Sequence, residues 1–349
     1  MQVKYFLTKE GTFVIENYNF SSPFASFFCG IAGVWGIPMW IFYVNRYQCI
    51  TSFGVESKNN PLLEFEPADK AFMNVGLKGF RTFLKFTKNK LIYEPFRPQT
   101  SQKIFQRMLI DSHKLTLEEI NKDLNIIFKV KYFLLPSEKY ASLVRILEII
   151  NLGTPSKIQL IDGLPVFLCS GVDNKLLKFL SYTVRSWMQT ESLEGKINFY
   201  RVRASIKDTP QVFKIKEGNF FTSFTYEKES IQFLKILVDP NKLFGQVTDF
   251  SFPYLLNEDF EFPQTQLTES QNLSAFGFWE GVLETKKELR IISLYGYMKD
   301  KSLYKYILDK ISNPEYIKEK EKQAFSIIES IKNCAFTVSN IPCLLYTSD

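Results

Sequence analysis

Apolar side chains fill residues 30–46, GIAGVWGIPMWIFYVNR, and no charged residue lies between Glu16 and Arg46. A membrane-spanning helix needs about 20 mostly apolar residues without interruption. Three glycines and Pro38 interrupt this segment and would weaken a helix at successive turns. We therefore predict a buried strand, a tight turn and a second buried strand, with a membrane span as the alternative.

Short runs of Val, Ile, Phe and Tyr separated by turn residues continue to about residue 296, a spacing typical of a β-sandwich. Tyr200 and Val202 alternate with Arg201 and Arg203, and the alternation continues to Ile206. This period of two predicts a strand with one buried face and one solvated face. The fold class we predict is mostly β, a large antiparallel β-sandwich (supersandwich).

Two turns are predicted within this region. The sequence LGTP at residues 152–155 separates the apolar runs 141–151 and 157–162, which predicts a hairpin between two sheet strands. Residues 216–219, KEGN, predict a second turn.

Helical periodicity occurs in three places. One inserted helix is predicted after Asp173, a suitable N-cap, from the spacing of Leu176, Leu177, Leu180, Val184 and Trp187. After Met298 an amphipathic stripe consists of Leu303, Tyr304, Ile307, Leu308 and Ile311. A second stripe begins after the capping sequence Asn313-Pro314-Glu315 and consists of Tyr316, Ile317, Ala324, Ile327, Ile328 and Ile331.

These patterns predict a β-sandwich domain at residues 1–296 and a helical linker at residues 297–340. The last residues, CLLYTSD at 343–349, resemble the translation of a sequencing adapter, so we interpret residues 341–349 as an artefact. The alternative is a short natural strand. An adapter here would mean that the reading frame was cut near residue 341 and that a further domain follows the linker.

Composition adds few constraints on function. The 43 basic and 37 acidic residues give a net charge of +6, and the basic residues are scattered, which argues against a nucleic-acid partner. The five cysteines form no CxxC pair, and the first residues, MQVKYFLTKEG, lack the pattern of a signal peptide. We expect a cytoplasmic protein with reduced thiols.

His113 is the only histidine of the chain. The chain therefore supplies no multi-histidine metal site, and a nucleophilic relay would depend on this one ring. Its polar neighbours suggest a solvated turn. No Gly-rich phosphate loop follows a predicted strand, and we expect neither a metal nor a cofactor.

Several short segments, taken in their order along the chain, resemble one enzyme family. They are residues 42–46, 52–54, 64–72, 143–145, 151–153, 161–165, 187–189, 199–205, 238–240 and 244–245. Together they are similar to the N-terminal domain of cellobiose-phosphorylase-like glycoside phosphorylases, most of all to the bacterial β-1,3-glucan phosphorylase branch. Tyr47 departs from the pattern, because a glycine is expected after Asn45-Arg46.

The resemblance implies a modular enzyme with an N-terminal sandwich, a helical linker, an α/α barrel that holds the active site and a small C-terminal β domain. Such enzymes resemble inverting glycosidases in which phosphate replaces the attacking water, so that one carboxylic acid is sufficient. That acid belongs to the barrel. We therefore expect no catalytic residue in this chain, an inactive fragment, oligosaccharide and phosphate as ligands of the whole enzyme, and a homodimer at full length.

Trp35, Trp40 and Arg46 are the candidate substrate-binding residues, because aromatic faces stack on sugar rings and a guanidinium binds phosphate or hydroxyl oxygens. Core packing is the alternative for the two tryptophans, and a salt bridge is the alternative for Arg46. Glu64 and Glu66 are predicted to share one strand face, but without a partner across a cleft they do not indicate an acid and base pair.

Two other functions stay open. The chain could be a complete carbohydrate-binding or interaction protein built on the same sandwich, because no catalytic constellation is visible. A membrane-anchored protein is the third reading.

Overall fold

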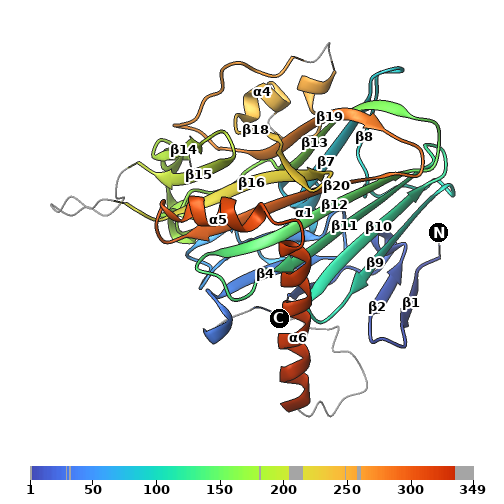
Figure 1. The fold of residues 1–349 in the computed structure, drawn as a ribbon, viewed down its shortest axis with the longest axis horizontal. Coiled ribbons are helices and arrows are strands. Elements are labelled where there is room, and N and C mark those ends of the chain that lie inside the picture. Colours follow the sequence, from blue (N-terminus) through green and yellow to red (C-terminus); the bar gives the residue numbers. More distant parts are fainter. Residues whose placement is uncertain are drawn as a thin grey trace.

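The computed structural model describes residues 2–28, 30, 33–180, 182–203, 215–247, 249–257 and 261–334. Within these residues the strands form antiparallel sheets of eleven, five and four strands (Figure 1). The predicted fold class, a mostly β antiparallel sandwich, is confirmed. Residues 341–349, which we interpreted as an artefact, and residues 204–206 of the predicted alternation lie outside the described residues.

The eleven-stranded sheet forms one layer, and its strands follow the order β1-β2-β9-β10-β11-β12-β20-β16-β15-β14, with β17 also paired to β16. Its central strands β12 and β20 are also its longest. The bounds are β1 Lys4–Leu7, β2 Phe13–Glu16, β9 Ile104–Ile110, β10 Lys114–Asn121, β11 Ile126–Leu134, β12 Ala141–Asn151, β14 Met188–Leu193, β15 Ile197–Val202, β16 Gly218–Glu227, β17 Ser230–Phe233 and β20 Glu288–Met298.

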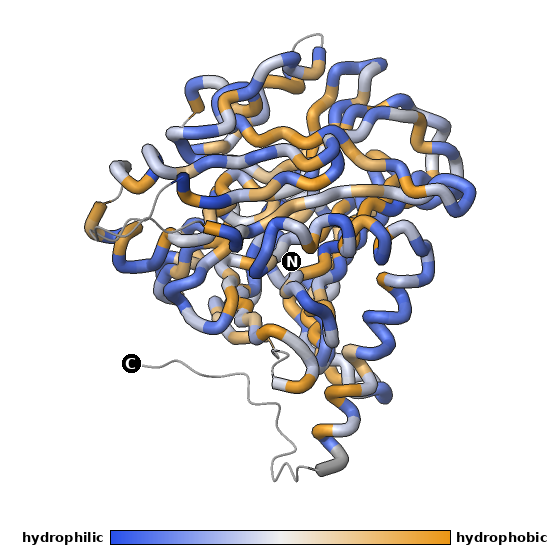
Figure 2. Tube along the Cα trace, turned by 60° about the vertical axis from the view of Figure 1, so that its left-hand side comes forward, coloured by the Kyte–Doolittle hydropathy of each residue, from blue (hydrophilic) through white to orange (hydrophobic). Residues whose placement is uncertain are grey.

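Two smaller sheets share one large core cluster with this layer. The five-stranded sheet has the order β18-β19-β13-β7-β8, with bounds β7 Arg81–Phe86, β8 Leu91–Tyr93, β13 Ser156–Leu164, β18 Lys235–Leu237 and β19 Ala275–Leu283. The four-stranded sheet has the order β3-β4-β5-β6, with bounds β3 Ala25–Phe27, β4 Met39–Val44, β5 Ile50–Val55 and β6 Pro61–Leu63. Figure 2 shows the hydrophobic segments concentrated along the strands in the body of the molecule.

The apolar segment at residues 30–46 is explained by a strand that is buried on both faces. In β4 the side chains of Met39, Ile41 and Tyr43 belong to the central core, whereas Phe42 and Val44 pack in a second cluster with helix α1 (Ala68–Lys78). A strand covered on both sides is apolar throughout and needs no membrane. Among the described residues, no helix is long and apolar enough to cross a bilayer.

The first half of this segment differs from the prediction. The strand that precedes β4 and pairs with it is β3, which ends at Phe27, before the segment begins. Gly33–Trp35 forms an exposed turn of 3-10 helix instead of a buried strand, and Val34 is 89% exposed. The prediction of two buried strands is therefore right only for the second one, since β3 lies before the segment and its residues are half-buried or exposed.

The predicted hairpin at residues 152–155 is wrong, although both flanking strands exist. β12 pairs with β11 and β20 in the large sheet, whereas β13 pairs with β7 and β19 in the five-stranded sheet. The connection thus crosses between the layers, and the Asn151 side chain holds it by donating to Thr154 O at 2.9 Å and Leu283 O at 2.8 Å. The turn predicted at residues 216–219 is also wrong, because Gly218 already begins β16.

Helices appear at each predicted place, with changes. Asp173 caps α2 (Asn174–Phe179) by accepting from Leu176 N at 2.7 Å, but the single predicted helix is divided into α2 and α3 (Tyr182–Arg185). The two helices after Met298 are α5 (Leu303–Ile311) and α6 (Tyr316–Cys334). Helices α1 (Ala68–Lys78) and α4 (Pro240–Phe244) were not predicted.

A buried charge network joins the layers. Arg145 on β12 and Asp162 on β13 are 0% and 1% exposed, and they form a two-point contact, with Nε–Oδ2 at 3.0 Å and Nη2–Oδ1 at 2.6 Å. Gln48 and Thr82 accept from the same guanidinium at 2.7 and 3.0 Å. Both charges are therefore paired and hydrogen-bonded, as burial requires.

His113 is not the solvated residue that we predicted. Its ring lies 5.1 Å from the Phe325 ring of α6, and Nδ1 is buried without a hydrogen-bond partner among the described residues. This desolvation lowers the pKa of His113. The turn at His113 thus forms part of the contact between the large sheet and α6, which Figure 1 shows running away from the sandwich.

Candidate functional site

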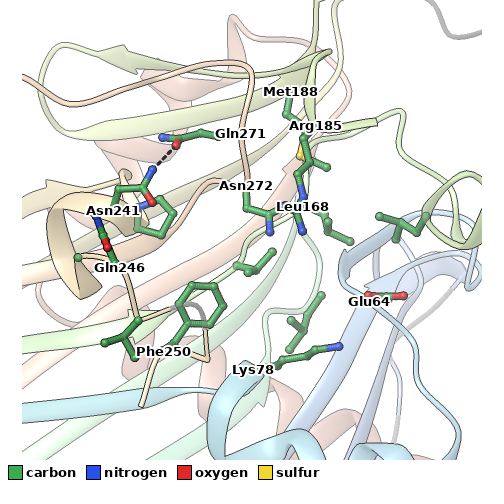
Figure 3. A pocket seen from close by; sticks show the side chains of 16 residues that line it. Glu64, Lys78, Leu168, Arg185, Met188, Asn241, Gln246, Phe250, Gln271 and Asn272 are labelled. Carbon is green, nitrogen blue, oxygen red and sulfur yellow. Dashed lines mark hydrogen bonds between the residues drawn. The ribbon is translucent and has the colours of Figure 1, made fainter. Parts of the chain in front are cut away.

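A groove of about 1040 Å³ lies among the described residues (Figure 3). Six separate parts of the chain line it. They are the end of β6 with Glu64, the end of α1 at Lys78, Val166 with Leu168 after β13, Leu177 of α2 with Arg185 and Met188, helix α4 with Gly245–Val247 and Phe250, and Gln271 with Asn272. This volume lies at the upper end of the range of roughly 300–1,000 Å³ that is usual for ligand pockets.

Amide side chains on one wall are held by Asp239. This buried carboxylate caps α4 by accepting from Asn241 N at 3.0 Å, and it also accepts from Gln271 Nε2 at 3.3 Å. The Asn241 side chain in turn donates to Gln271 Oε1 at 2.9 Å (Figure 3). Two amides are thus fixed at the groove, where each retains further hydrogen-bonding capacity.

Charged side chains of both signs border the opposite side. Glu64 is the only carboxylate among the described lining residues, and burial raises the pKa of its side chain although Lys78 opposes the change. Lys78 forms an ion pair with Glu66, which also accepts from Asn74 Nδ2 at 2.9 Å. Glu64 and Glu66 follow β6 rather than sharing a strand face, which corrects the prediction.

Phe250 adds an aromatic ring to the groove (Figure 3). Its ring centroid lies 5.2 Å from that of Phe244, and its backbone O accepts from Arg81 Nη1 at 2.8 Å. Together with Leu168 and Met188 it makes part of the lining apolar. An arrangement of amides, one carboxylate, cationic groups and a ring is suited to binding a polyhydroxylated molecule.

The described lining of the groove contains one carboxylate, that of Glu64. Its single described carboxylate has no second carboxylate across the cavity to form an acid and base pair. The described residues also contain no group of three or more His, Cys, Asp or Glu side chains that could hold a metal ion. Cys49 and Cys169 are buried, and burial raises the pKa of both thiols, so neither is an activated nucleophile.

The predicted site residues do not line this groove. Trp35 lies on the exposed 3-10 turn and is 36% exposed. Trp40 is partly buried, with its ring 5.9 Å from the Phe65 ring. Trp40 packs with the cluster between β4 and α1, whereas Trp35 lies apart from it. A sugar contact by these residues stays a prediction.

Arg46 stacks on aromatic rings instead of forming a salt bridge among the described residues. Its guanidinium carbon lies 5.1 Å from the Phe72 centroid and 5.5 Å from the Tyr47 centroid. Tyr47 has a φ of 50°, a left-handed conformation that favours glycine, which is the residue that the resemblance led us to expect. Tyr47 O accepts from the Tyr18 hydroxyl, and its ring lies against Gly76 of α1, so tertiary contacts hold this conformation.

Sequence reasoning missed the groove because its lining residues are far apart in the chain. One signal was available, since Asp239-Pro240 is a helix start of the type found for α4, with a capping carboxylate and a first-turn proline. No signal joined α4 to Glu64 or Arg185.

No protein-family model matches the sequence, and no curated protein matches it either. Among solved structures, a polysaccharide lyase has a TM-score of 0.42 at 11% identity, over 78% of this chain and 34% of the other. A putative kojibiose phosphorylase from human microbiome has 0.33 at 8%, over 89% and 29%. A GalM/aldose epimerase homologue from C. elegans has 0.37 at 11%, over 80% and 100%.

These three proteins are named as carbohydrate-active enzymes or as a homologue of one, and the chain spans about a third of the length of the first two. With TM-scores below 0.5 and identities near 10%, these likenesses do not decide a function.

Proposed function

We propose that this chain is the non-catalytic sandwich and helical linker of an inverting glycoside phosphorylase, which converts a β-glucan oligosaccharide and phosphate into glucose 1-phosphate. One observation carries the proposal. Segments on which the resemblance rests, although separate in sequence, meet at the groove through Glu64, Met188, Pro240 and Gly245.

Two further resemblance segments have a structural role that suits a scaffold domain. Arg145 belongs to one and Asp162 to the other, and their buried ion pair joins the two layers of the sandwich. The residues that carry the resemblance thus hold the fold together and line a groove. This arrangement suits a domain that recognises the substrate without catalysing the reaction. In the proposed enzyme the carboxylic acid that protonates the leaving oxygen lies in the barrel, and phosphate attacks the anomeric carbon.

In this proposal the groove is the face that the domain presents to the oligosaccharide. The amides of Asn241 and Gln271 hydrogen-bond with sugar hydroxyls, and the Phe250 ring contacts a sugar face. Phosphate reaches the barrel, and the whole enzyme is a cytoplasmic homodimer.

The experiment is a phosphate-release assay on the protein encoded by the complete gene, with glucose 1-phosphate as donor and a panel of glucose oligomers as acceptors. We expect phosphate release that depends on the acceptor. The 349-residue chain alone should release none. A complete gene product that lacks a helical barrel and releases no phosphate with any acceptor would overturn the proposal.

The groove itself favours a second candidate, a stand-alone carbohydrate-binding protein, because amides and a partly buried carboxylate can bind sugars without a barrel. The two candidates differ in one variant experiment. Asn241→Ala in the complete protein should raise the KM for the acceptor if the protein is a phosphorylase, whereas in a binding protein it should change only the dissociation constant of the oligosaccharide.

A further inference from the structure

Trp279 on β19 lies at an open edge of the five-stranded sheet. β18 pairs with Phe276, Gly277 and Phe278 of β19, so that the pairing ends one residue before Trp279. A Cβ atom on Gly281 would lie 2.5 Å from Cζ2 and 2.6 Å from Cη2 of the indole. The ring therefore lies over Gly281, and the absence of a side chain there gives it room.

Cavities of about 420 and 310 Å³ lie beside this indole, and Trp279, Thr225 and Glu227 line both of them. Neither shares a lining residue with the groove described above. No described residue accepts a hydrogen bond from the indole N–H of Trp279. The side chain is half-buried, and its N–H is not among the buried donors of the described residues. An aromatic ring with a free donor between two cavities is a site for a ligand that extends across both.

The charges around Trp279 indicate the chemistry of that ligand. Among the described residues, Glu227, Glu229, Glu284 and Glu288 line these cavities, are exposed and form no ion pair. Carboxylates without a cation accept hydrogen bonds from hydroxyl groups and repel anions. The cavities are also lined by three cationic side chains, those of Lys287, Arg290 and Lys235, which would repel a polycationic ligand.

We propose that Trp279 and the two cavities form a second, non-catalytic groove that binds a neutral oligosaccharide. The electron-rich face of the indole contacts the C–H face of one sugar ring, and the carboxylates and the indole N–H bind hydroxyl groups on either side. The choice of a β-glucan as the ligand rests on the proposed function. The groove keeps a long substrate on the enzyme while a different part of it reacts.

The test is calorimetric titration of the 349-residue chain with laminarihexaose and with cellohexaose. Trp279→Ala should weaken binding at least about tenfold. Gly281→Ala keeps the tryptophan but displaces its ring, so it should also weaken binding while the melting temperature stays near that of the parent. Tyr5→Ala removes an aromatic side chain, 52% exposed, at the far edge of the large sheet and should leave the affinity unchanged.

NMR signals of the indole N–H groups locate the ligand independently of affinity. The signal that is lost in Trp279→Ala should shift on addition of either hexasaccharide. Equal affinities in the parent and in both Trp279→Ala and Gly281→Ala, or no binding of either sugar, would overturn the inference. The titration needs no catalysis. If the phosphate-release assay fails while Trp279-dependent binding is intact, the proposed enzyme function is rejected but the second groove is not.

Discussion

Asp162→Asn is the substitution that most sharply tests how this sandwich is held together. The amide keeps the size of the side chain but removes the negative charge that faces Arg145, which is 0% exposed. Thr82 Oγ1 donates to Asp162 Oδ1 at 2.6 Å, and two of the hydrogen bonds of the guanidinium end on this carboxylate. The variant thus leaves a buried cation without its counter-charge.

Breaking a buried ion pair by removing one partner lowers the free energy of unfolding by about 3–5 kcal/mol. The guanidinium carbon of Arg145 lies 4.9 Å from the Phe80 ring centroid and 5.3 Å from the Tyr132 ring centroid. These rings continue to stabilise the cation in the variant, so we expect a loss of unfolding free energy in the lower half of this range. With an m-value of about 3 kcal/mol/M, the urea midpoint should fall by roughly 1 M.

The control is Glu280→Gln, which removes a different ion pair, the one between Lys157 of β13 and Glu280 of β19. Glu280 contacts Lys157 at 2.8 Å, but the two side chains are 36% and 59% exposed, so the change in unfolding free energy should stay below about 1 kcal/mol. Equilibrium unfolding in urea, followed by circular dichroism and fluorescence, gives both values. If Asp162→Asn destabilises the chain no more than Glu280→Gln does, the buried pair does not hold the layers together.

Three further substitutions test other contacts. Trp40→Ala should destabilise the chain by about 3 kcal/mol because the ring packs in the cluster beside α1, and an unchanged melting temperature would instead favour a solvent-facing, sugar-binding role. Gly76→Ala should lower the melting temperature, since a Cβ there would lie 2.5 Å from the Tyr47 ring, and Tyr47→Gly in the same chain should restore it; no restoration would contradict the contact. The lowered pKa of His113 means that the unfolded chain binds more protons, so stability should fall as the pH drops from about 7.5 to 5.5; His113→Gln should reduce this slope, and an equal slope in a melting series would refute it.

The fold class could be predicted from the sequence because the burial of each strand determines the pattern of apolar and polar residues along it. The charge-free run before Arg46 ends in β4, a strand buried on both faces. Tyr200 and Val202 are buried on β15 with the less buried Arg201 between them, as the period of two predicted. Local turn residues, however, do not record which sheet the next strand joins, and for that reason the predicted hairpin at residues 152–155 was wrong.

The groove could not be predicted in the same way. Glu64, Arg185 and Asn241 meet only because α1, α3 and α4 take their places around the sheets. Helix α1 was not predicted, and Glu64 and Glu66 were interpreted as strand residues, so the residues that border the groove were placed on the wrong element. Trp40 and Arg46 drew attention as residue types, but the structure places both against packed rings.

The central claim is that this sandwich belongs to an inverting phosphorylase, and the most direct measurement is the NMR spectrum of the products that the complete gene product forms from a β-glucan oligosaccharide. With phosphate present, the account predicts α-glucose 1-phosphate and an oligosaccharide shortened by one glucose, with no cleavage when phosphate is omitted. Cleavage that proceeds equally without phosphate, or no cleavage of any β-glucan, would contradict it.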